Sequence, residues 1–369
     1  EGGGFRERHH FRSGIRRSSS RTMRILLFAA MIMALPLTSA FAPAVPAFSA
    51  SRSPLRCAPA TTSLKFATAR GAARLAPVYM VAGESPAAGL RAKLATKQIL
   101  TMPCCFDALS AKLVERAGFD ITFMSGFSTS AAKLALPDTG LMSYGEMLDA
   151  GRDICAAVSI PVLGDGDTGY GNAMNVKRTV RGYAQAGFAA IMIEDQVAPK
   201  RCGHTKGKSV VGRDEAIGRV RAAVDARNEG ADILILARTD SREGLGLEEA
   251  LERIRLFAEA GADIVFMEAP QSIEEMRAAC QAAPNTPHLA NMLEGGKTPI
   301  LPPAQLQELG FGIAAYPLTL LSASISAMNT ALDDLKAGRD ASNILEFSEL
   351  RDIVGFNDYY AEEERYKQE

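Results

Sequence analysis

Residues 187–195 read Gly-Phe-Ala-Ala-Ile-Met-Ile-Glu-Asp, and this stretch shows the pattern that decides the fold. Gly187 is typical of a helix end, because glycine readily adopts the left-handed conformation that closes a helix. The apolar run after it has the composition of a strand that is buried on both faces. The run ends in Glu194 and Asp195, so a helix end, a buried strand and a polar edge follow one another directly.

The same unit recurs along the chain after residue 80. Glycines that each precede a short apolar run lie at Gly118, Gly187, Gly230, Gly261 and Gly310. Together with the other apolar runs they give eight expected strands, at residues 99–102, 121–124, 161–164, 190–193, 233–237, 264–267, 288–290 and 313–315. Strands that alternate with helices indicate parallel pairing and right-handed crossovers.

The number of units decides between two α/β architectures. Eight units over about 250 residues, from 90 to 340, have the size of a TIM barrel. A doubly wound open sheet is the alternative, but no glycine-rich phosphate loop follows the first expected strand. We therefore predict an α/β fold, a (β/α)₈ TIM barrel with extra C-terminal helices over 344–367, in a single catalytic domain at 81–369.

Charge is distributed unevenly along the chain. Residues 1–80 hold 12 of the 41 Lys and Arg but only two of the 42 acidic residues, so residues 81–369 carry a net charge of −11. An acidic folded part argues against nucleic acid as a partner. The six cysteines show no C-x-x-C spacing, which favours thiols in a reducing compartment.

The first eighty residues have the composition of a targeting presequence. No Asp or Glu occurs between Glu7 and Glu84, and Arg24 precedes an apolar run at 25–37 that ends in small residues. We expect a signal peptide at 23–40 and a disordered transit peptide at 41–80. Residues 1–22, before Met23, are interpreted as a gene-model artefact. After removal of the presequence we expect no membrane partner.

The junction at Ser39-Ala40-Phe41-Ala42-Pro43 resembles the bipartite presequences of algae with secondary plastids. The resemblance implies delivery to a plastid. The secretory pathway and the mitochondrion are the alternatives.

Polar residues gather where the expected strands end, at the edge where a barrel enzyme has its active site. They are Ser125, Gly126, residues 165–171 (Asp-Gly-Asp-Thr-Gly-Tyr-Gly), Glu194, Asp195, Arg238, Thr239, Asp240, Glu268, Asn291 and Tyr316. Each has a structural explanation by itself, since an Asp at a strand end often caps a helix and Arg238 has a ready partner in Glu268. Their density on one edge favours an active site.

Asp165 and Asp167 predict a metal site. Only glycine separates them, so a strand-like backbone would point both carboxylates to the same side. Adjacent carboxylates repel unless a cation lies between them. With Glu194 they form an all-oxygen set suited to Mg²⁺, with Mn²⁺ as the alternative. The sequence after residue 80 holds only His204 and His288, so a zinc cluster is not expected.

The loop at 196–208 is rich in Lys and Arg and contains one thiol, Cys202. Such a loop suits a lid that closes over an anionic substrate. Neighbouring cations would favour the thiolate of Cys202. The cysteines on apolar patterns are expected to be buried filler: Cys104, Cys105, Cys155 and Cys280.

Several of these motifs resemble signatures of the isocitrate lyase/phosphoenolpyruvate mutase superfamily. They are Ser125-Gly126, Asp138, the run at 165–171, Glu194-Asp195-Gln196 and Lys200-Arg201-Cys202-Gly203-His204. The resemblance implies an enzyme that binds an α-hydroxy or α-keto carboxylate with Mg²⁺ and cleaves a carbon–carbon bond through an enolate. It also implies a homotetramer in which the helix after the eighth strand is swapped between subunits.

The resemblance implies a role for each site residue. Catalytic roles fall to Cys202, which would protonate the departing enolate, to Arg238, which would counter charge at the α-oxygen, and to Glu194, Lys200 and His204. Substrate contacts fall to Ser125, Gly126, Phe127, Gly203, Glu268 and Asn291. Metal binding falls to Asp165, Asp167 and Glu194, and Asp138 belongs to the layer behind the metal ligands.

Two differences from methylisocitrate lyases favour a smaller substrate, a dicarboxylate. Phe123 stands where those enzymes have a tyrosine, and residues 319–322 lack their arginine. Without that guanidinium a third carboxylate loses its natural partner. Residues 291–299 resemble the plant branch of 2-alkylmalate lyases, oxaloacetate hydrolases and carboxyvinyl-carboxyphosphonate phosphorylmutase-like proteins.

We therefore expect a carbon–carbon lyase that acts on a 2-alkylmalate or oxaloacetate. The alternatives are a phosphoenolpyruvate/phosphonopyruvate-type phosphomutase, which Cys202 disfavours, a methylisocitrate lyase, and a non-catalytic protein that keeps the barrel as a scaffold.

Overall fold

The computed structural model of the chain describes residues 84–203 and 207–367. The expected presequence, with its parts at 23–40 and 41–80, lies outside the described residues, and so does His204. The described strands are β1 (Leu100–Cys105), β2 (Thr122–Met124), β3 (Val162–Asp165), β4 (Ala190–Glu194), β5 (Leu234–Thr239), β6 (Ile264–Met267), β7 (Leu289–Asn291) and β8 (Ile313–Tyr316).

Helices alternate with these strands. Those of the barrel are α1 (Pro86–Ala95), α2 (Ala108–Arg116), α3 (Gly126–Leu134), α4 (Tyr144–Ala157), α5 (Ala173–Ala186), α6 (Arg213–Asn228), α7 (Ser241–Leu245), α8 (Leu247–Glu259), α9 (Ile273–Ala282) and α10 (Pro303–Leu309). The helices after β8 are α11 (Thr319–Lys336), α12 (Phe347–Val354) and α13 (Phe356–Glu364).

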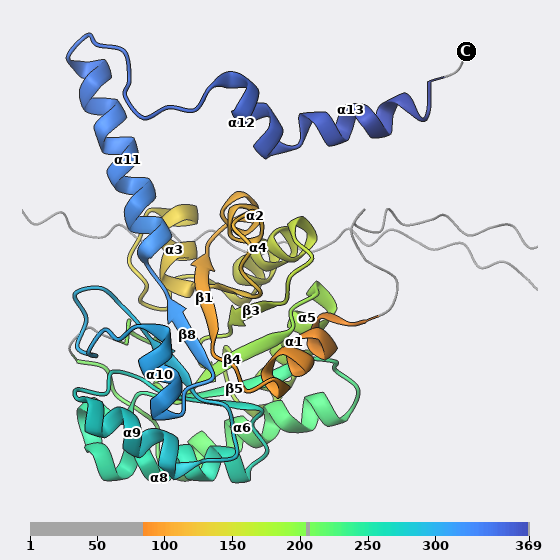
Figure 1. Cartoon of the computed structure of the whole chain (residues 1–369). Coiled ribbons are helices and arrows are strands. Elements are labelled where there is room, and N and C mark those ends of the chain that lie inside the picture. Colours follow the sequence, from red (N-terminus) through yellow and green to blue (C-terminus); the bar gives the residue numbers. More distant parts are fainter. Residues whose placement is uncertain (1–83, 204–206, 368–369) are drawn as a thin grey trace, which may run out of the picture. The chain divides into compact units, whose positions relative to one another are not determined.

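The strands form one parallel sheet that curls into a barrel (Figure 1). Their order is β6-β5-β4-β3-β2-β1-β8-β7, with every pair parallel. A parallel bridge between Val265 of β6 and His288, next to β7, brings the two outer strands together. The described residues thus form a nearly closed barrel of eight strands. The predicted TIM barrel is confirmed, and a doubly wound open sheet is excluded.

All eight expected strands are present, and β6 has the expected bounds. The largest difference is in β1, which continues beyond residue 102 to Cys105. Pro103 has no N–H to donate and is unusual inside a sheet, yet it stays in register with Tyr316 of β8. The helix-closing glycines are also as expected, since Gly187 ends α5 at φ +100° and Gly310 ends α10 at φ +109°.

Apolar side chains fill the inside of the barrel. One buried cluster takes Met102, Phe123, Met192, Leu236 and Phe266 from five different strands. Ala87 and Leu90 of α1 belong to the same cluster and are fully buried, so α1 packs against the interior of the barrel. The larger buried cluster lies between the strands and the surrounding helices. This core fixes where each strand ends and hence where its last polar residue lies.

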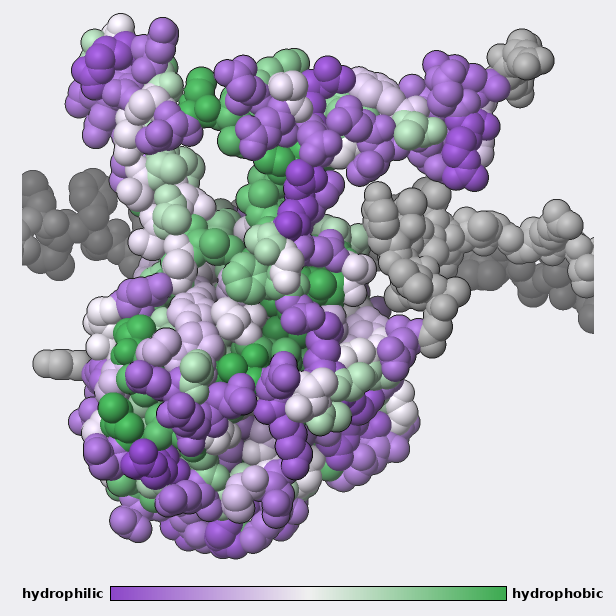
Figure 2. Space-filling view, in the orientation of Figure 1, coloured by the Kyte–Doolittle hydropathy of each residue, from purple (hydrophilic) through white to green (hydrophobic). Residues whose placement is uncertain are grey.

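The expected C-terminal helices are present, although α12 begins at Phe347 rather than at 344. None of the residues of α11, α12 and α13 is buried in the chain. Apolar side chains reach the surface along this segment (Figure 2), including Met328, Leu332, Leu335 and Phe347. Helix swapping remains a prediction. Among the described residues, no helix is both long and apolar enough to cross a membrane.

Candidate active site

A pocket lies at the carboxyl ends of the barrel strands. Its polar lining consists of Ser125, Asp138, Asp165, Cys202, Gly203, Arg238, Glu268 and Asn291. Its apolar lining includes Met102, Cys104, Phe123, Phe127, Met192, Phe266, Leu289, Leu293, Ala315, Pro317 and Leu318. A lining of both polar and apolar side chains suits a small ligand that carries both charged and hydrocarbon groups.

Most of the residues predicted from the sequence meet here. Apart from the polar lining, Phe127 also borders the pocket. Gly126, Asp167, Glu194 and Lys200 lie directly against lining residues. His204 lies outside the described residues.

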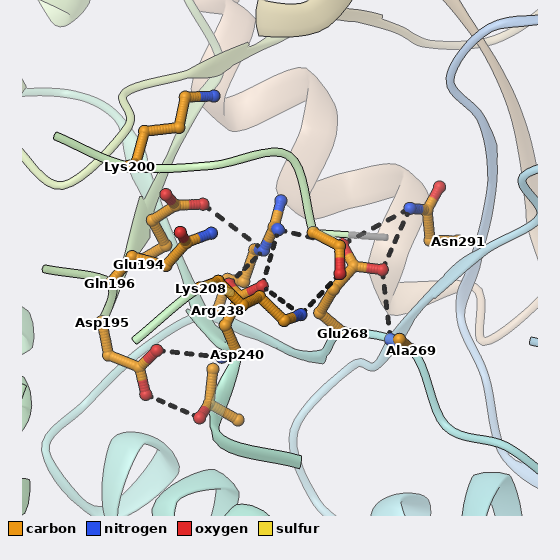
Figure 3. Close-up of polar contacts among 12 residues, drawn as sticks. Glu194, Asp195, Gln196, Lys200, Lys208, Arg238, Asp240, Glu268, Ala269 and Asn291 are labelled. Atoms are coloured by element: carbon orange, nitrogen blue, oxygen red, sulfur yellow. Dashed lines mark hydrogen bonds and ion pairs between the residues drawn. The ribbon is translucent and has the colours of Figure 1, made fainter. Parts of the chain in front are cut away.

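Arg238, at the end of β5, is surrounded by carboxylates (Figure 3). Its Nε and Nη2 donate to the two oxygens of Asp240 at 2.8 and 3.0 Å. Nη2 also lies 3.1 Å from Glu268 Oε2, and Nε lies 3.4 Å from Glu194 Oε2. The guanidinium stacks over the Phe266 ring at 5.4 Å. The simple Arg238–Glu268 pair considered from the sequence is therefore one contact of a larger network.

Asp240 joins this arginine to the loop after β4. Its Oδ1 accepts from Lys208 Nζ at 2.9 Å, and the same Nζ donates to Gly203 O at 2.5 Å. Burial opposes the charge of Asp240, but Arg238 and Lys208 outweigh burial and hold the pKa of this carboxyl below its usual value. The sequence placed Asp240 on the active-site edge without predicting its partners, because contacts between distant segments are not visible in a local pattern.

Asp195 and Arg253 support Asp240 through hydrogen bonds, and no sequence motif indicates a role for Arg253. Asp195 accepts from the Asp240 N–H at 2.9 Å and from Thr239 Oγ1 at 2.6 Å. Arg253 of α8, 1% exposed, donates to Asp195 at 2.9 Å. It lies among the buried positions Ala250, Ile254 and Phe257 of this helix. A cation within an apolar helical stripe was the signal that could have identified it.

The three predicted metal ligands are buried and close to one another, but the reason given for Asp167 was wrong. β3 ends at Asp165, and Asp167 has a left-handed φ of +47°, so its backbone is not strand-like. A turn brings the two residues together instead, with the Asp167 N–H donating to Asp165 Oδ1 at 3.0 Å. Burial raises the pKa of Asp165 above its usual value, while the Lys200 charge opposes this.

Glu194 provides the test of whether these residues fit a metal. Neither of its buried carboxylate oxygens has a hydrogen bond from the protein, since Arg238 approaches only at ion-pair distance. Burial raises the pKa of Glu194 well above its usual value, with the Arg238 charge opposing. Buried oxygens without donors, next to two further carboxylates, fit a hard divalent cation.

A lysine lies among these carboxylates. Lys200 Nζ is 2.6 Å from Asp138 Oδ1 and 2.8 Å from Asp167 Oδ1, and only 5% of the lysine is exposed. Burial alone would lower the pKa of Lys200, but Asp167, Asp165, Asp138 and Glu194 outweigh it and raise that pKa well above its usual value. In the described part of the chain, no three His, Cys, Asp or Glu residues are arranged as a ready-made metal cage.

The first turn of α3 provides an anion-binding element. The Ser125 side chain caps this helix by accepting from the Ser128 N–H at 3.2 Å. A helix N-terminus favours negative charge, because its first N–H groups have no partner within the helix. A Cβ atom at Gly126 would lie 2.4 Å from Asp165 Oδ2, so a larger residue there would displace this carboxylate from the acidic cluster.

The loop after β4 approaches the pocket closely at Gly203. A Cβ atom there would collide with Arg238 Nη2 and with Glu268, so only glycine allows this approach. Cys202, next to it, lines the pocket and is partly exposed. Among the other four described cysteines, Cys104, Cys105 and Cys280 are buried, although Cys104 also borders the pocket. Cys155 is partly exposed rather than buried as expected.

Comparison with known proteins identifies the family. Residues 90–336 match the model of the phosphoenolpyruvate phosphomutase family. The chain belongs to this family. It is 44% identical to 2,3-dimethylmalate lyase of Eubacterium barkeri over 76% of this chain and 98% of the relative. It is 40% identical to 2-methylisocitrate lyase of Aeropyrum pernix over 77% of this chain and 92% of the relative.

Solved structures of the phosphoenolpyruvate mutase/isocitrate lyase superfamily share the fold. Oxaloacetate acetylhydrolase in complex with the inhibitor 3,3-difluorooxalacetate is 34% identical with a TM-score of 0.72, covering 75% of this chain and 95% of that one. Phosphonopyruvate hydrolase in complex with oxalate and Mg²⁺ is 30% identical with a TM-score of 0.69, covering 77% of this chain and 99% of that one. The chain is thus an enzyme of this superfamily, which includes lyases, mutases and hydrolases.

Proposed function

We propose that this chain is a Mg²⁺-dependent lyase that cleaves the C2–C3 bond of a small 2-hydroxy dicarboxylate such as a 2-alkylmalate, or hydrolyses oxaloacetate. The observation that carries the proposal is the pocket itself. It brings Arg238, the α3 N-terminus and the Cys202 thiol around one acidic cluster, and apolar side chains complete its lining. The similarity to 2,3-dimethylmalate lyase supports the same reaction class.

Binding would use the two anion-binding elements of the pocket. The C1 carboxylate would lie against the first N–H groups of α3 and the N–H of Gly203, where partial positive charge is fixed in place. Arg238 would face the 2-oxygen. Because Asp240 holds the guanidinium through two hydrogen bonds, its orientation is set before the substrate arrives, which avoids reorganisation during the reaction.

Bond cleavage then requires two proton movements. As the C2–C3 bond breaks, the 2-hydroxyl proton leaves to a neighbouring buried carboxylate and the 2-oxygen becomes a carbonyl. The electron pair of the broken bond moves to C3, and the Cys202 thiol donates a proton to that carbon. The products are a 2-keto acid and a carboxylic acid.

Asp165, Asp167 and Glu194 would hold the metal, with Mn²⁺ as the alternative to Mg²⁺. Bound there, the ion supplies positive charge that stabilises negative charge as it develops on the substrate. Asp138 would contribute through Lys200, with which it pairs.

The pocket lining supports a dicarboxylate rather than a tricarboxylate. Among the described residues that line it, Arg238 is the only Arg or Lys. Residues 319–322, which follow the lining residues Pro317 and Leu318, lack the arginine expected of methylisocitrate lyases. Phe123, also in the lining, brings no hydroxyl. An alkyl substituent would pack against these apolar side chains, whereas a third carboxylate would lack a cationic partner.

A phosphomutase is the second candidate, because the matching family model is that of phosphoenolpyruvate phosphomutase. A screen of the purified protein with Mg²⁺ tests both candidates. We expect cleavage of 2-alkylmalates or oxaloacetate. Turnover of phosphonopyruvate alone would favour the mutase, and turnover of methylisocitrate above the dicarboxylates would overturn the substrate argument.

The chain's location and assembly are part of the proposal. The acid-free composition of residues 8–83 supports delivery to a plastid. The exposed apolar side chains of α11 support a homotetramer, since Leu332 and Leu335 are each 61% exposed within the single chain.

A further inference from the structure

Lys200 places an ammonium group among the carboxylates to which we assign the metal. Its Nζ lies 2.7 Å from Asp138 Oδ2 and 2.8 Å from Asp167 Oδ1. Asp165 and Glu194 are close enough to act on its charge. The lysine therefore contributes a positive charge to the cluster that a divalent cation would also enter.

Two cations cannot share these oxygens without strong mutual repulsion, because Coulomb energies rise steeply at short distance in a buried site. Lys200 lies in the loop between β4 and α6, outside any strand or helix. Its ammonium is carried on a flexible four-carbon stem. The side chain can thus withdraw from Asp167 while the barrel strands that carry Asp165 and Glu194 stay in place.

We propose that Lys200 is an internal cation that competes with Mg²⁺ for the carboxylate of Asp167, and so sets the metal affinity of the site. The inference rests on the proposed metal site of Asp165, Asp167 and Glu194. The alternative to competition is a scaffold role, in which the lysine would hold the carboxylates in place for the metal. Competition predicts that removing the ammonium tightens metal binding, whereas a scaffold role predicts that it weakens binding.

Isothermal titration of the purified full-length protein with MgCl₂ distinguishes the two roles. We expect Lys200→Gln to lower the Mg²⁺ dissociation constant by roughly 5–150-fold, the usual range for coupling between two binding events. Lys200→Arg keeps the charge and should bind no more tightly than the wild type. Arg201→Gln is the matched control, since it removes the same charge from the adjacent, exposed residue.

Thermal unfolding provides a second readout in case Lys200→Gln folds poorly without metal. The variant leaves several buried carboxylates without their ammonium, so saturating Mg²⁺ should raise its Tm by more than it raises that of the wild type. Equal or weaker Mg²⁺ binding by Lys200→Gln would overturn the competition. If neither the wild type nor any variant binds Mg²⁺, the metal assignment itself fails, which is a separate result.

Discussion

Replacing Asp240 with Asn tests whether the network around Arg238 is essential to the site. Asp240 has a fully buried side chain and accepts three charged hydrogen bonds, two from Arg238 and one from Lys208. Breaking a buried ion pair costs about 3–5 kcal/mol. Arg238 keeps Glu268 at 3.1 Å and Lys208 keeps Gly203 O at 2.5 Å, so neither cation is left alone. We therefore expect Asp240→Asn to lose about 3 kcal/mol of unfolding free energy, the lower end of that range.

The variant should also lose activity, because Arg238 then turns toward Glu268 and away from its orientation at the 2-oxygen. Urea unfolding followed by circular dichroism, together with kcat on the best substrate, measures both effects. Glu275→Gln is the control, since Glu275 also receives two hydrogen bonds from one arginine, Arg242, at 2.8 and 2.6 Å, but nearer the surface. It should lose less unfolding free energy than Asp240→Asn, because both of its partners are partly exposed to solvent.

The network around Arg238 is not essential if Asp240→Asn unfolds at the same urea concentration as the Glu275→Gln control and retains the wild-type kcat. Acid provides an independent check. The folded-state pKa of Asp240 is lowered, so its contribution to stability is present above its unfolded pKa of about 3.9 and is lost as the pH falls further. The difference in stability between the wild type and Asp240→Asn should shrink below that pH.

Three further predictions follow from other parts of the molecule. Cys202→Ser should leave KM nearly unchanged and lower kcat by roughly 10²–10⁴-fold, because a hydroxyl is a weaker general acid than a thiol. The control Cys280→Ser should keep the wild-type kcat, and equal rates for Cys202→Ser and wild type would exclude the thiol as the acid. Burial lowers the pKa of His288, against the hydrogen bond to Ala283 O, so the neutral ring stabilises the fold above about pH 6.5 and that stability is lost as the pH falls. The Tm of the wild type should therefore fall from pH 7 to 5 by more than that of His288→Gln, and parallel curves would contradict this. Residues 1–80 fused to a fluorescent protein should reach the plastid in an alga with a secondary plastid, and Phe41→Ala should stop it earlier; cytosolic fluorescence of the unchanged fusion would refute the assignment.

The fold could be predicted because its signals are local. A glycine such as Gly187, an apolar run and the acidic Glu194 follow one another within nine residues, and the physics of a helix end and a buried strand acts over that length. Parallel pairing then places all strand ends on one edge, so the sequence predicts the polar residues that line the pocket.

The partners of the site residues could not be predicted, because they come from distant segments. Lys208 meets Asp240 32 positions later, and Arg253 reaches back 58 positions to Asp195. The backbone at Asp167 was misjudged for another reason. A non-glycine residue in the left-handed region is uncommon, and only the surrounding turn reveals that it is required.

We propose that this enzyme cleaves a carbon–carbon bond in a small dicarboxylate with the help of Mg²⁺. Incubation of the purified protein with 2,3-dimethylmalate, followed by NMR, tests it most directly. With Mg²⁺ present we expect pyruvate and propionate in equal amounts, no products after dialysis against excess EDTA, and restored turnover when Mg²⁺ is added back. Intact 2,3-dimethylmalate together with interconversion of phosphonopyruvate and phosphoenolpyruvate, or full cleavage in excess EDTA, would contradict the account.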